Sequence, residues 1–246
     1  MYIQFIQTYK FTLLSFQIIY QDEALIAIHK PYGFFVHKSA LDARADQIVL
    51  NQLRDQIGQY VYPVHRLDRK TSGLLLMALN KDMQRKMNDL FMVGEVSKEY
   101  HAIVRGHTPQ SLTIDYPLLH DDGRMQDAAT VLETLQKMEI PIANGNHPTS
   151  RYSLVKLMPK TGRMHQLRRH MAHIFHPILA DRPHGCNKQN KLFLEKFQLH
   201  EMMLHARSLS FVKPGSDQKL TIACEYSNEF SRILNGLTFW VPNSDY

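Results

Sequence analysis

The sequence contains little cysteine and no long hydrophobic run. Its two cysteines, Cys186 and Cys224, are far apart and lack the paired spacing of a zinc site, so we expect neither a disulfide scaffold nor a cysteine metal site. No stretch reaches the roughly 18 consecutive apolar residues that a membrane span needs. Polar residues interrupt segment 11–20 and no small-residue cleavage site follows it, so no signal peptide is expected. We therefore expect a cytoplasmic protein whose cysteines are packing residues.

The remaining composition is typical of a globular chain. With 246 residues, 44% of them hydrophobic and 21% charged, the chain can hold one large core or two small ones. The periodicity predicts mixed α and β structure in which strands dominate. The expected strands are 18–20, 24–29, 61–64, 74–79, 98–106, 152–158, 202–212 and 219–225. The expected helices are one ending at Gly58, one capped by Asn80, one over 163–174 and one over 229–234.

Positive charge is concentrated in one segment. Residues 151–191 hold nine lysines and arginines against one acid, Asp181, whereas the whole chain has a formal net charge of only +6. Five of these nine are arginines, and histidines lie between them. A basic stripe of this kind predicts contact with a polyanion such as nucleic acid. The alternative is a solvated, lysine-rich face.

One acid lies in an unusual loop. Asp68 follows a β-branched and aromatic run, is flanked by Arg66, Arg69 and Lys70, and precedes the apolar run 74–79. Three cations are expected to keep its carboxylate ionised. Such a carboxylate is either the hub of a structural ion-pair network or a nucleophile for an electrophilic carbon.

A second unusual charge lies in the helix predicted over 163–174. Arg168 falls on or beside the apolar stripe of that helix, where an unpaired guanidinium would be costly. Its partner is expected to be Asp68, with Asp181 or a C-terminal acid as the alternative. At the start of this helix, Thr161 is expected to cap, and the free N–H groups near Gly162 favour an anion such as phosphate.

Together these segments resemble the successive motifs of the RluA-type pseudouridine synthases. The resemblance rests on residues 65–73, 98–106 and 160–170, continues through 30–37, 176–185 and 204–206, and covers about residues 18–225 in the family's order. Within the family, the chain is most similar to the tRNA-modifying branch that acts on uridine 65. It departs from the family's pattern at Phe175 and Ala180, where glycine is usual, and at His184, where tyrosine is usual.

The resemblance implies an α+β fold with a mixed, mainly antiparallel sheet, flanking helices and a central RNA-binding cleft. It implies a single catalytic domain over residues 18–246, with residues 1–17 as an extension outside it. Asp68 resembles the catalytic aspartate and Arg168 its ion-pair partner. Tyr100, the third residue expected to be catalytic, resembles the ring that packs on the target uracil, and the C5 proton is expected to pass either to Tyr100 or through a relay. The residues expected to bind substrate are Arg66, which resembles the arginine that enters the RNA stack, together with His65, Leu67, Thr71, Thr161, Gly162, Arg163, His165 and Gln166.

The implied reaction breaks the N1–C1′ bond of a uridine, turns the base and rejoins it through C5, without cofactor or metal. Asp68 either attacks C1′ or acts as a base at C2′, and the sequence leaves both open. The expected partner is RNA, with tRNA favoured and ribosomal RNA as the alternative. We expect a monomer with no membrane association and no obligatory protein partner.

Two other functions explain parts of the sequence. A metal-dependent hydrolase would use the histidine group His165, His170, His173 and His176, but their steps do not place them on one helix face and no HExxH pattern occurs. A non-catalytic RNA-binding module would explain the basic stripe but not the loop around Asp68.

Overall fold

The computed structural model describes residues 15–37, 47–143 and 147–239. Within these ranges the chain forms strands β1 (Ile18–Gln21), β2 (Leu25–Lys30), β3 (Tyr62–Pro63), β4 (Ser72–Ala78), β5 (Ser97–Arg105), β6 (Ser111–Asp115), β7 (Leu118–Leu119), β8 (Met125–Gln126), β9 (Ala129–Ile140), β10 (Ser150–Pro159), β11 (Leu204–Val212) and β12 (Lys219–Ala223). The helices are α1 (Val49–Ile57), α2 (Lys81–Val93), α3 (Gln166–His173), α4 (Asn187–Phe197) and α5 (Asn228–Thr238).

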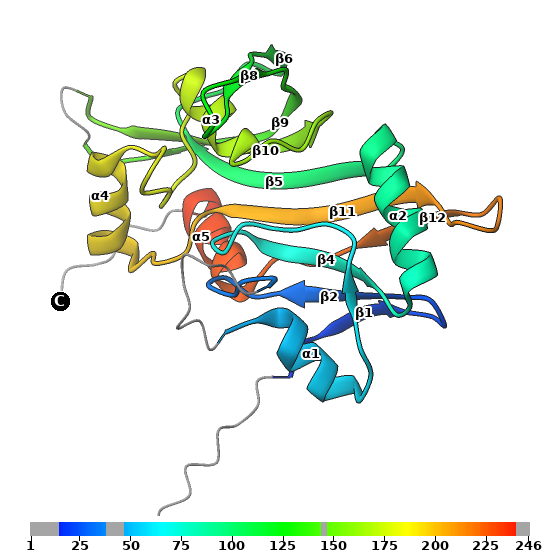
Figure 1. Ribbon diagram of the computed structural model, residues 1–246. Helices are drawn as coiled ribbons and strands as arrows, with labels where there is room; N and C mark the ends of the chain where they lie inside the picture. The colour runs from blue at the N-terminus through cyan, green and yellow to red at the C-terminus, as the bar shows by residue number, and fades with distance from the viewer. Residues whose placement is uncertain (1–14, 38–46, 144–146, 240–246) are drawn as a thin grey trace, which may run out of the picture.

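Ten strands form one sheet in the order β1-β2-β4-β11-β5-β10-β9-β6, with β12 paired to β11 and β3 to β4. In Figure 1 these strands run across the view, with α3 above β10 and α1 beside β1 at the lower edge. A separate two-stranded sheet joins β7 and β8. The predicted α+β class with a mixed, mainly antiparallel sheet and flanking helices is therefore confirmed.

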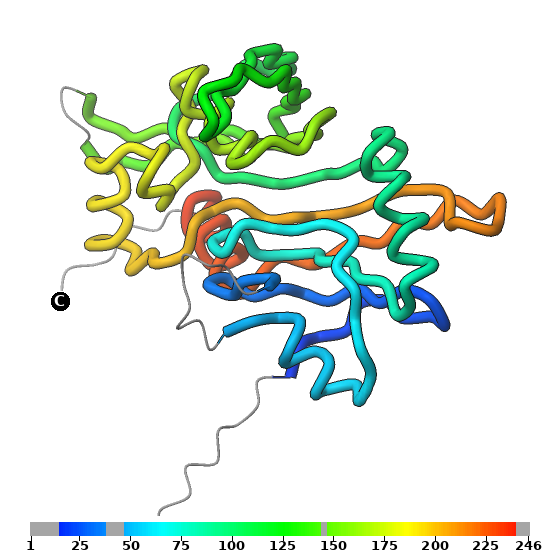
Figure 2. Tube along the Cα trace, in the orientation of Figure 1, coloured from blue at the N-terminus to red at the C-terminus, as the bar shows by residue number. Residues whose placement is uncertain are grey.

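A parallel pairing at the middle of the sheet joins two distant parts of the chain. Strand β4 pairs with β11 through His205↔Ser72 and Ala206↔Gly73, whereas the other strand pairs of the described sheet are antiparallel. Figure 2 shows these two segments side by side. Gly73 has φ +106, and a Cβ there would lie 2.3 Å from the carbonyl oxygen of Ala206. Only glycine fits this approach, so it fixes the end of the loop that carries Asp68.

The hydrophobic core of the described chain lies in two clusters. Strands β2 and β4 contribute a nearly continuous buried run to the first, and β5 and β10 contribute to the second. Tyr100 packs against both clusters. Within the described chain, no helix has the length and apolar character needed to cross a membrane.

The predicted local signals mostly produce the expected elements. The 18–29 hairpin is formed by β1 and β2. The Asn80 side chain accepts a hydrogen bond from the Met83 N–H at 2.9 Å and caps α2, and Gly58 ends α1 with φ 68. The predicted strand over 61–64 is shorter than expected and spans only Tyr62–Pro63. Helix α4 and strands β6 to β9 were not predicted as separate elements.

The helix predicted over 163–174 is shorter at its N-terminus, and its predicted cap is wrong. Helix α3 begins at Gln166, after His165 in a left-handed conformation with φ 53. Thr161 does not cap it. Instead the Thr161 hydroxyl donates to Gln166 Oε1 at 2.6 Å, because the loop turns back onto the first residue of the helix.

The folded unit includes residues that were predicted to precede it. Phe16 is only 3% exposed and packs edge-on against Phe34. Its backbone N–H donates to Gln56 Oε1, and its carbonyl oxygen accepts from Gln56 Nε2. Phe16 thus belongs to the described core, and the domain bounds of 18–246 remain a prediction. The predictions that concern residues 1–14, 144–146 and 240–246 lie outside the described residues.

Candidate active site

The loop between β3 and β4 is tied to the segment that follows β2. The Thr71 N–H donates to the Asp68 carbonyl oxygen at 3.0 Å and closes a turn. Lys30 is fully buried, and its ammonium donates to the carbonyl oxygens of Arg69 at 3.2 Å and Phe34 at 3.0 Å. Burial lowers the Lys30 pKa to about 7, and the negative charges of Asp68 and Glu201 oppose that shift. These bonds hold the Asp68 backbone in place from beneath the loop.

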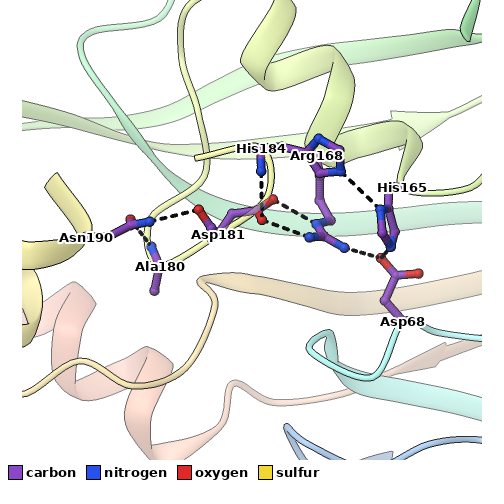
Figure 3. A network of polar contacts seen from close by, with 7 residues as sticks. All are labelled: Asp68, His165, Arg168, Ala180, Asp181, His184 and Asn190. Carbon is purple, nitrogen blue, oxygen red and sulfur yellow. Dashed lines mark hydrogen bonds and ion pairs between the residues drawn. The ribbon is translucent and has the colours of Figure 1, made fainter. Parts of the chain in front are cut away.

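Arg168 joins two acids from different parts of the chain (Figure 3). Its Nε and Nη2 donate to the two carboxylate oxygens of Asp181, both at 2.8 Å, and its Nη1 donates to Asp68 Oδ2 at 3.2 Å. Arg168 is 4% exposed and Asp181 is 1% exposed, whereas the Asp68 carboxylate is 29% exposed. The predicted partner and its alternative are thus both present. The bidentate pair fixes the guanidinium plane, and the third donor orients the accessible acid.

Asp181 is itself held by its neighbours. Its carbonyl oxygen accepts from Asn190 Nδ2 at 2.8 Å, and its carboxylate accepts from the His184 N–H at 3.3 Å. The Asn190 side chain also accepts from the Ala180 N–H at 2.9 Å. A Cβ at Gly185 would lie 1.8 Å from the Asp181 carbonyl oxygen, so the loop can close only with glycine there.

His165 completes the surroundings of Asp68. Its Nε2 lies 3.7 Å from Asp68 Oδ2, and its Nδ1 lies 3.1 Å from His184 Nε2 (Figure 3). Burial lowers the His165 pKa below its usual value, against the attraction of Asp68. The imidazole is therefore neutral at pH 7, and the charge that balances Asp68 comes from Arg168.

Tyr100 lies on β5 near the same acid. Burial, and then the negative charge of Asp68, raise the Tyr100 pKa well above its usual value near 10. The phenol is therefore protonated at neutral pH, so it can pack on a ligand or donate a hydrogen bond but cannot serve as a base.

The loop that precedes α3 is organised by one buried amide. Gln166 is 4% exposed, and its Oε1 accepts from Thr161 Oγ1 and from the Arg163 N–H. Its Nε2 donates to the Ala129 carbonyl oxygen and to Thr130 Oγ1. Both ends of the amide are thus occupied within the protein. Gln166 positions the loop, and its predicted contact with substrate remains a prediction.

The other residues of the predicted binding set fall into two groups. Leu67 and Thr71 are buried, and His65 accepts a hydrogen bond from the Leu76 N–H at 2.9 Å while it stacks on Phe91. These three side chains support the loop. The second group is exposed and comprises Arg66, Gly162 and Arg163. Arg66 has no hydrogen-bond or ion-pair partner within the described part of the chain.

Part of the basic stripe is neutralised by acids that are distant in the sequence. Arg151 pairs with Glu139, and Lys156 pairs with Glu133 across β9 and β10. Arg168 is committed to its two carboxylates. The cations of the stripe without an acidic partner among the described residues are Lys160, Arg163, Arg169, Arg182 and Lys188. The stripe is therefore weaker than its local net charge suggested.

The histidines of the rival hydrolase hypothesis are spread among separate contacts. His170 bonds Thr130 Oγ1 and the Tyr116 carbonyl oxygen, His173 stacks on Tyr116, and His176 bonds the Arg105 carbonyl oxygen. Each ring has its own protein partner, so this geometry does not favour a shared metal ion.

A surface pocket of about 360 Å³, lined by residues that include Arg105 and Gln189, contains none of the predicted site residues.

Two of the three departures from the family's pattern have a left-handed backbone. Phe175 has φ 64 and Ala180 has φ 59, conformations that cost a residue with a side chain about 1–2 kcal/mol relative to glycine. Asn190 holds Ala180 in this conformation, and the Phe175 side chain is 86% exposed. The third departure, His184, takes part in the site through His165 and Asp181. The structure thus adds Lys30, His184 and Asn190 as support for the site that the sequence did not identify.

Comparison with known proteins agrees with this geometry. The model of the RNA pseudouridylate synthase family matches residues 24–173. The chain is 46% identical over 230 residues to a tRNA pseudouridine synthase C of Vibrio cholerae, covering 89% of this chain and 94% of that protein. It is 45% identical over 232 residues to the protein of the same name from Haemophilus ducreyi, covering 90% and 96%. A solved structure, human RNA pseudouridylate synthase domain containing 4, superposes with a TM-score of 0.69 at 27% identity and covers 92% of this chain and 95% of its own. This chain therefore belongs to the RNA pseudouridylate synthase family.

Proposed function

We propose that this protein isomerises a uridine of tRNA to pseudouridine, with uridine 65 as the target and Asp68 as the catalytic group. The observation that carries the assignment is the accessible Asp68 carboxylate held by a buried Arg168, in a chain of this family. The curated relatives are named as tRNA pseudouridine synthases, which supports tRNA over ribosomal RNA as the substrate. The choice of position 65 rests on the resemblance to that branch of the family.

The two oxygens of the Asp68 carboxylate have different surroundings. Oδ2 accepts a hydrogen bond from Arg168 Nη1, whereas Oδ1 has no hydrogen-bond partner among the described residues. Oδ1 is therefore the oxygen available to the ribose, either to form a bond with C1′ or to remove the proton at C2′. The guanidinium orients the carboxylate through this hydrogen bond.

The target base must leave its stack before it can reach this carboxylate. Unstacking costs a few kcal/mol, which contacts between cations and phosphates offset. Lys160, Arg163 and Arg182 are exposed, have no acidic partner in the described part of the chain, and can make such contacts. The flipped uracil would then pack on Tyr100. Burial and the negative charge of Asp68 raise the pKa of Tyr100, which favours a relay over direct transfer of the C5 proton to this phenol.

Isomerisation and RNA affinity should be measured separately. Wild-type protein is incubated with tRNA transcripts, and pseudouridine is mapped by mass spectrometry of nuclease fragments. Asp68→Asn is expected to abolish product while it retains RNA affinity, and a transcript with cytidine at position 65 should gain no pseudouridine. A transcript of ribosomal RNA tests the alternative substrate. Unchanged turnover by Asp68→Asn would refute the assignment of the catalytic group, and retained affinity without any turnover by wild-type protein would favour a non-catalytic RNA-binding module.

We further propose that the folded unit acts as one catalytic domain and as a monomer in the cytoplasm, with no obligatory protein partner. Multi-angle light scattering of the free protein and of its tRNA complex tests the stoichiometry. A mass of one chain per tRNA is expected, and a stable dimer that binds one tRNA would contradict it.

A further inference from the structure

A second group of reactive side chains lies on the sheet away from Asp68. His29 comes from β2, His205 from β11, and Cys224 directly follows β12. One nitrogen from each imidazole and the Cys224 sulfur lie within 4.8 Å of one another. Cys224 is 1% exposed, and His205 is fully buried. His29 is half-buried as a residue, although its Nε2 atom is buried.

Two imidazole nitrogens of this group lack a hydrogen-bond partner among the described residues. The Nε2 atoms of His29 and His205 are both buried and without a hydrogen bond within the described chain. Leaving a buried polar atom unsatisfied costs about 1–3 kcal/mol, so two such atoms beside one thiol need an explanation. The two rings meet edge to face with their centroids 5.6 Å apart, so they do not satisfy each other through a hydrogen bond.

The other nitrogen of His205 is already fixed. His205 Nδ1 lies 3.0 Å from the hydroxyl oxygen of Ser72. If Nδ1 carries the proton and donates to this hydroxyl, then Nε2 presents a lone pair. Histidines that bind a metal ion commonly have their second nitrogen held in this way, because the hydrogen bond sets both tautomer and ring orientation.

The chemistry of the donors selects a class of ion. Two imidazole nitrogens and one sulfur suit borderline or soft transition metals, whereas Mg²⁺ and Ca²⁺ prefer oxygen. The Cys224 thiol lies 3.4 Å from the Glu225 carbonyl oxygen, a weak contact that it can give up.

We propose that His29, His205 and Cys224 form a binding site for a d¹⁰ metal ion, Zn²⁺ or Cu⁺. Bond lengths of about 2.0–2.3 Å place donors around such an ion at roughly 3.5 Å from one another, closer than the 4.8 Å within which the three atoms now lie, so the donors must draw together when the ion binds. The ion would join β2, β11 and the end of β12. It would also lock Ser72, which lies on the same loop-to-strand segment as Asp68. This site is independent of the proposed reaction.

Cobalt(II) provides the direct probe, because its bond to a thiolate gives a charge-transfer absorption in the near ultraviolet. Tag-free full-length protein is stripped with a chelator, checked by circular dichroism and titrated with Co²⁺, followed by Zn²⁺ to displace it. Cu⁺ binding is measured separately in competition with a chromogenic chelator. We expect one equivalent of metal per chain, a thiolate band with Co²⁺, and a higher melting temperature with Zn²⁺ or Cu⁺. Displacement of cobalt by zinc assigns Zn²⁺ to the site, and tight retention of Cu⁺ alone assigns Cu⁺.

Matched variants separate this site from adventitious binding by the other histidines. Cys224→Ala and His29→Ala should lose the stoichiometric site, whereas Cys186→Ala, which removes the half-exposed cysteine, should retain it. Ser72→Ala should lower the affinity about 10- to 100-fold, because it removes only the hydrogen bond behind the ligand. The proposal is overturned if folded wild-type protein shows neither a thiolate band nor chelator-resistant Cu⁺. It is equally overturned if Cys224→Ala binds metal as wild-type protein does.

Discussion

The same substitution at the two acids that contact Arg168 should affect activity in one case and stability in the other. Asp68 is 29% exposed and receives one guanidinium nitrogen at 3.2 Å, whereas Asp181 is 1% exposed and receives two at 2.8 Å. Replacing either aspartate by asparagine removes one negative charge with almost no change in volume. We expect Asp68→Asn to abolish turnover with little change in stability, and Asp181→Asn to destabilise the fold.

The magnitudes follow from burial. Asp68→Asn leaves the bidentate pair intact and removes a partly exposed ion pair, so the free energy of unfolding should fall by about 0–1 kcal/mol. Asp181→Asn leaves a guanidinium that is 4% exposed with only one partial counter-charge. Removing one partner of a buried pair costs about 3–5 kcal/mol, or roughly 6–20 °C in melting temperature for a chain of this size.

Urea unfolding followed by circular dichroism gives the stabilities, and pseudouridine formation in tRNA gives the activity. Asp89→Asn, which changes an exposed acid on α2, is the matched control and should alter neither. The reasoning fails if Asp68→Asn loses 3 kcal/mol or more, because the acid would then be a structural hub. It also fails if Asp181→Asn is as stable as wild-type protein, because the buried pair would then contribute nothing.

Three further predictions test the remaining parts of the site. Tyr100→Ala should lower kcat/KM about 5- to 150-fold, the equivalent of 1–3 kcal/mol of stacking. Tyr100→Phe should retain most activity below pH 9, because the wild-type phenol is not a base there. A large loss of activity with Tyr100→Phe would show that the hydroxyl participates. Burial lowers the pKa of His65 to about 3, so the folded protein keeps this ring neutral while the unfolded chain protonates it below about pH 6.5. The contribution of this ring to stability is therefore full above pH 6.5 and is lost as the pH falls toward 3. Between pH 6.5 and 5, the free energy of urea unfolding of His65→Gln should depend less on pH than that of wild-type protein, by up to about 1.4 kcal/mol per pH unit. Equal slopes for the two proteins would contradict this. Arg163→Ala should reduce the slope of log affinity for tRNA against log salt concentration by about one unit. Arg151→Ala, which removes a cation already paired with a glutamate, should change this slope little. Equal effects of the two substitutions would mean that pairing does not determine which cations contact phosphate.

Local signals in the sequence predicted local structure well. The caps at Asn80 and Gly58, the hairpin of β1 and β2 and the buried run of β4 each depend on neighbouring residues, and each forms as expected. The start of α3 was misplaced because its first turn is set by a tertiary contact. Gln166 reaches Ala129 and Thr130, which lie far away in the sequence, and the chain turns to allow this contact.

The local net charge of segment 151–191 overestimates its positive field for the same reason. The segment 151–191 contains one acid, but the glutamates of β9 lie opposite its basic residues in the register of β9 with β10. The sequence patterns did not predict separate strands over residues 111–140, so these ion pairs could not be anticipated. A local excess of one charge therefore overestimates the field at the surface whenever an oppositely charged strand is its neighbour in the sheet.

The pairing of Arg168 shows why the two sequence hypotheses did not exclude each other. A carboxylate that only neutralised the guanidinium would be buried with it, and one that acts on a substrate must stay accessible. A single acid cannot meet both requirements well. The structure divides them: Asp181 neutralises and orients the buried cation, and the cation then presents its remaining N–H to Asp68 at the surface. The cluster of basic residues beside Asp68 in the sequence suggested that local cations stabilise it. The fold instead supplies the cation from α3, which keeps the outer face of the carboxylate open to a ribose.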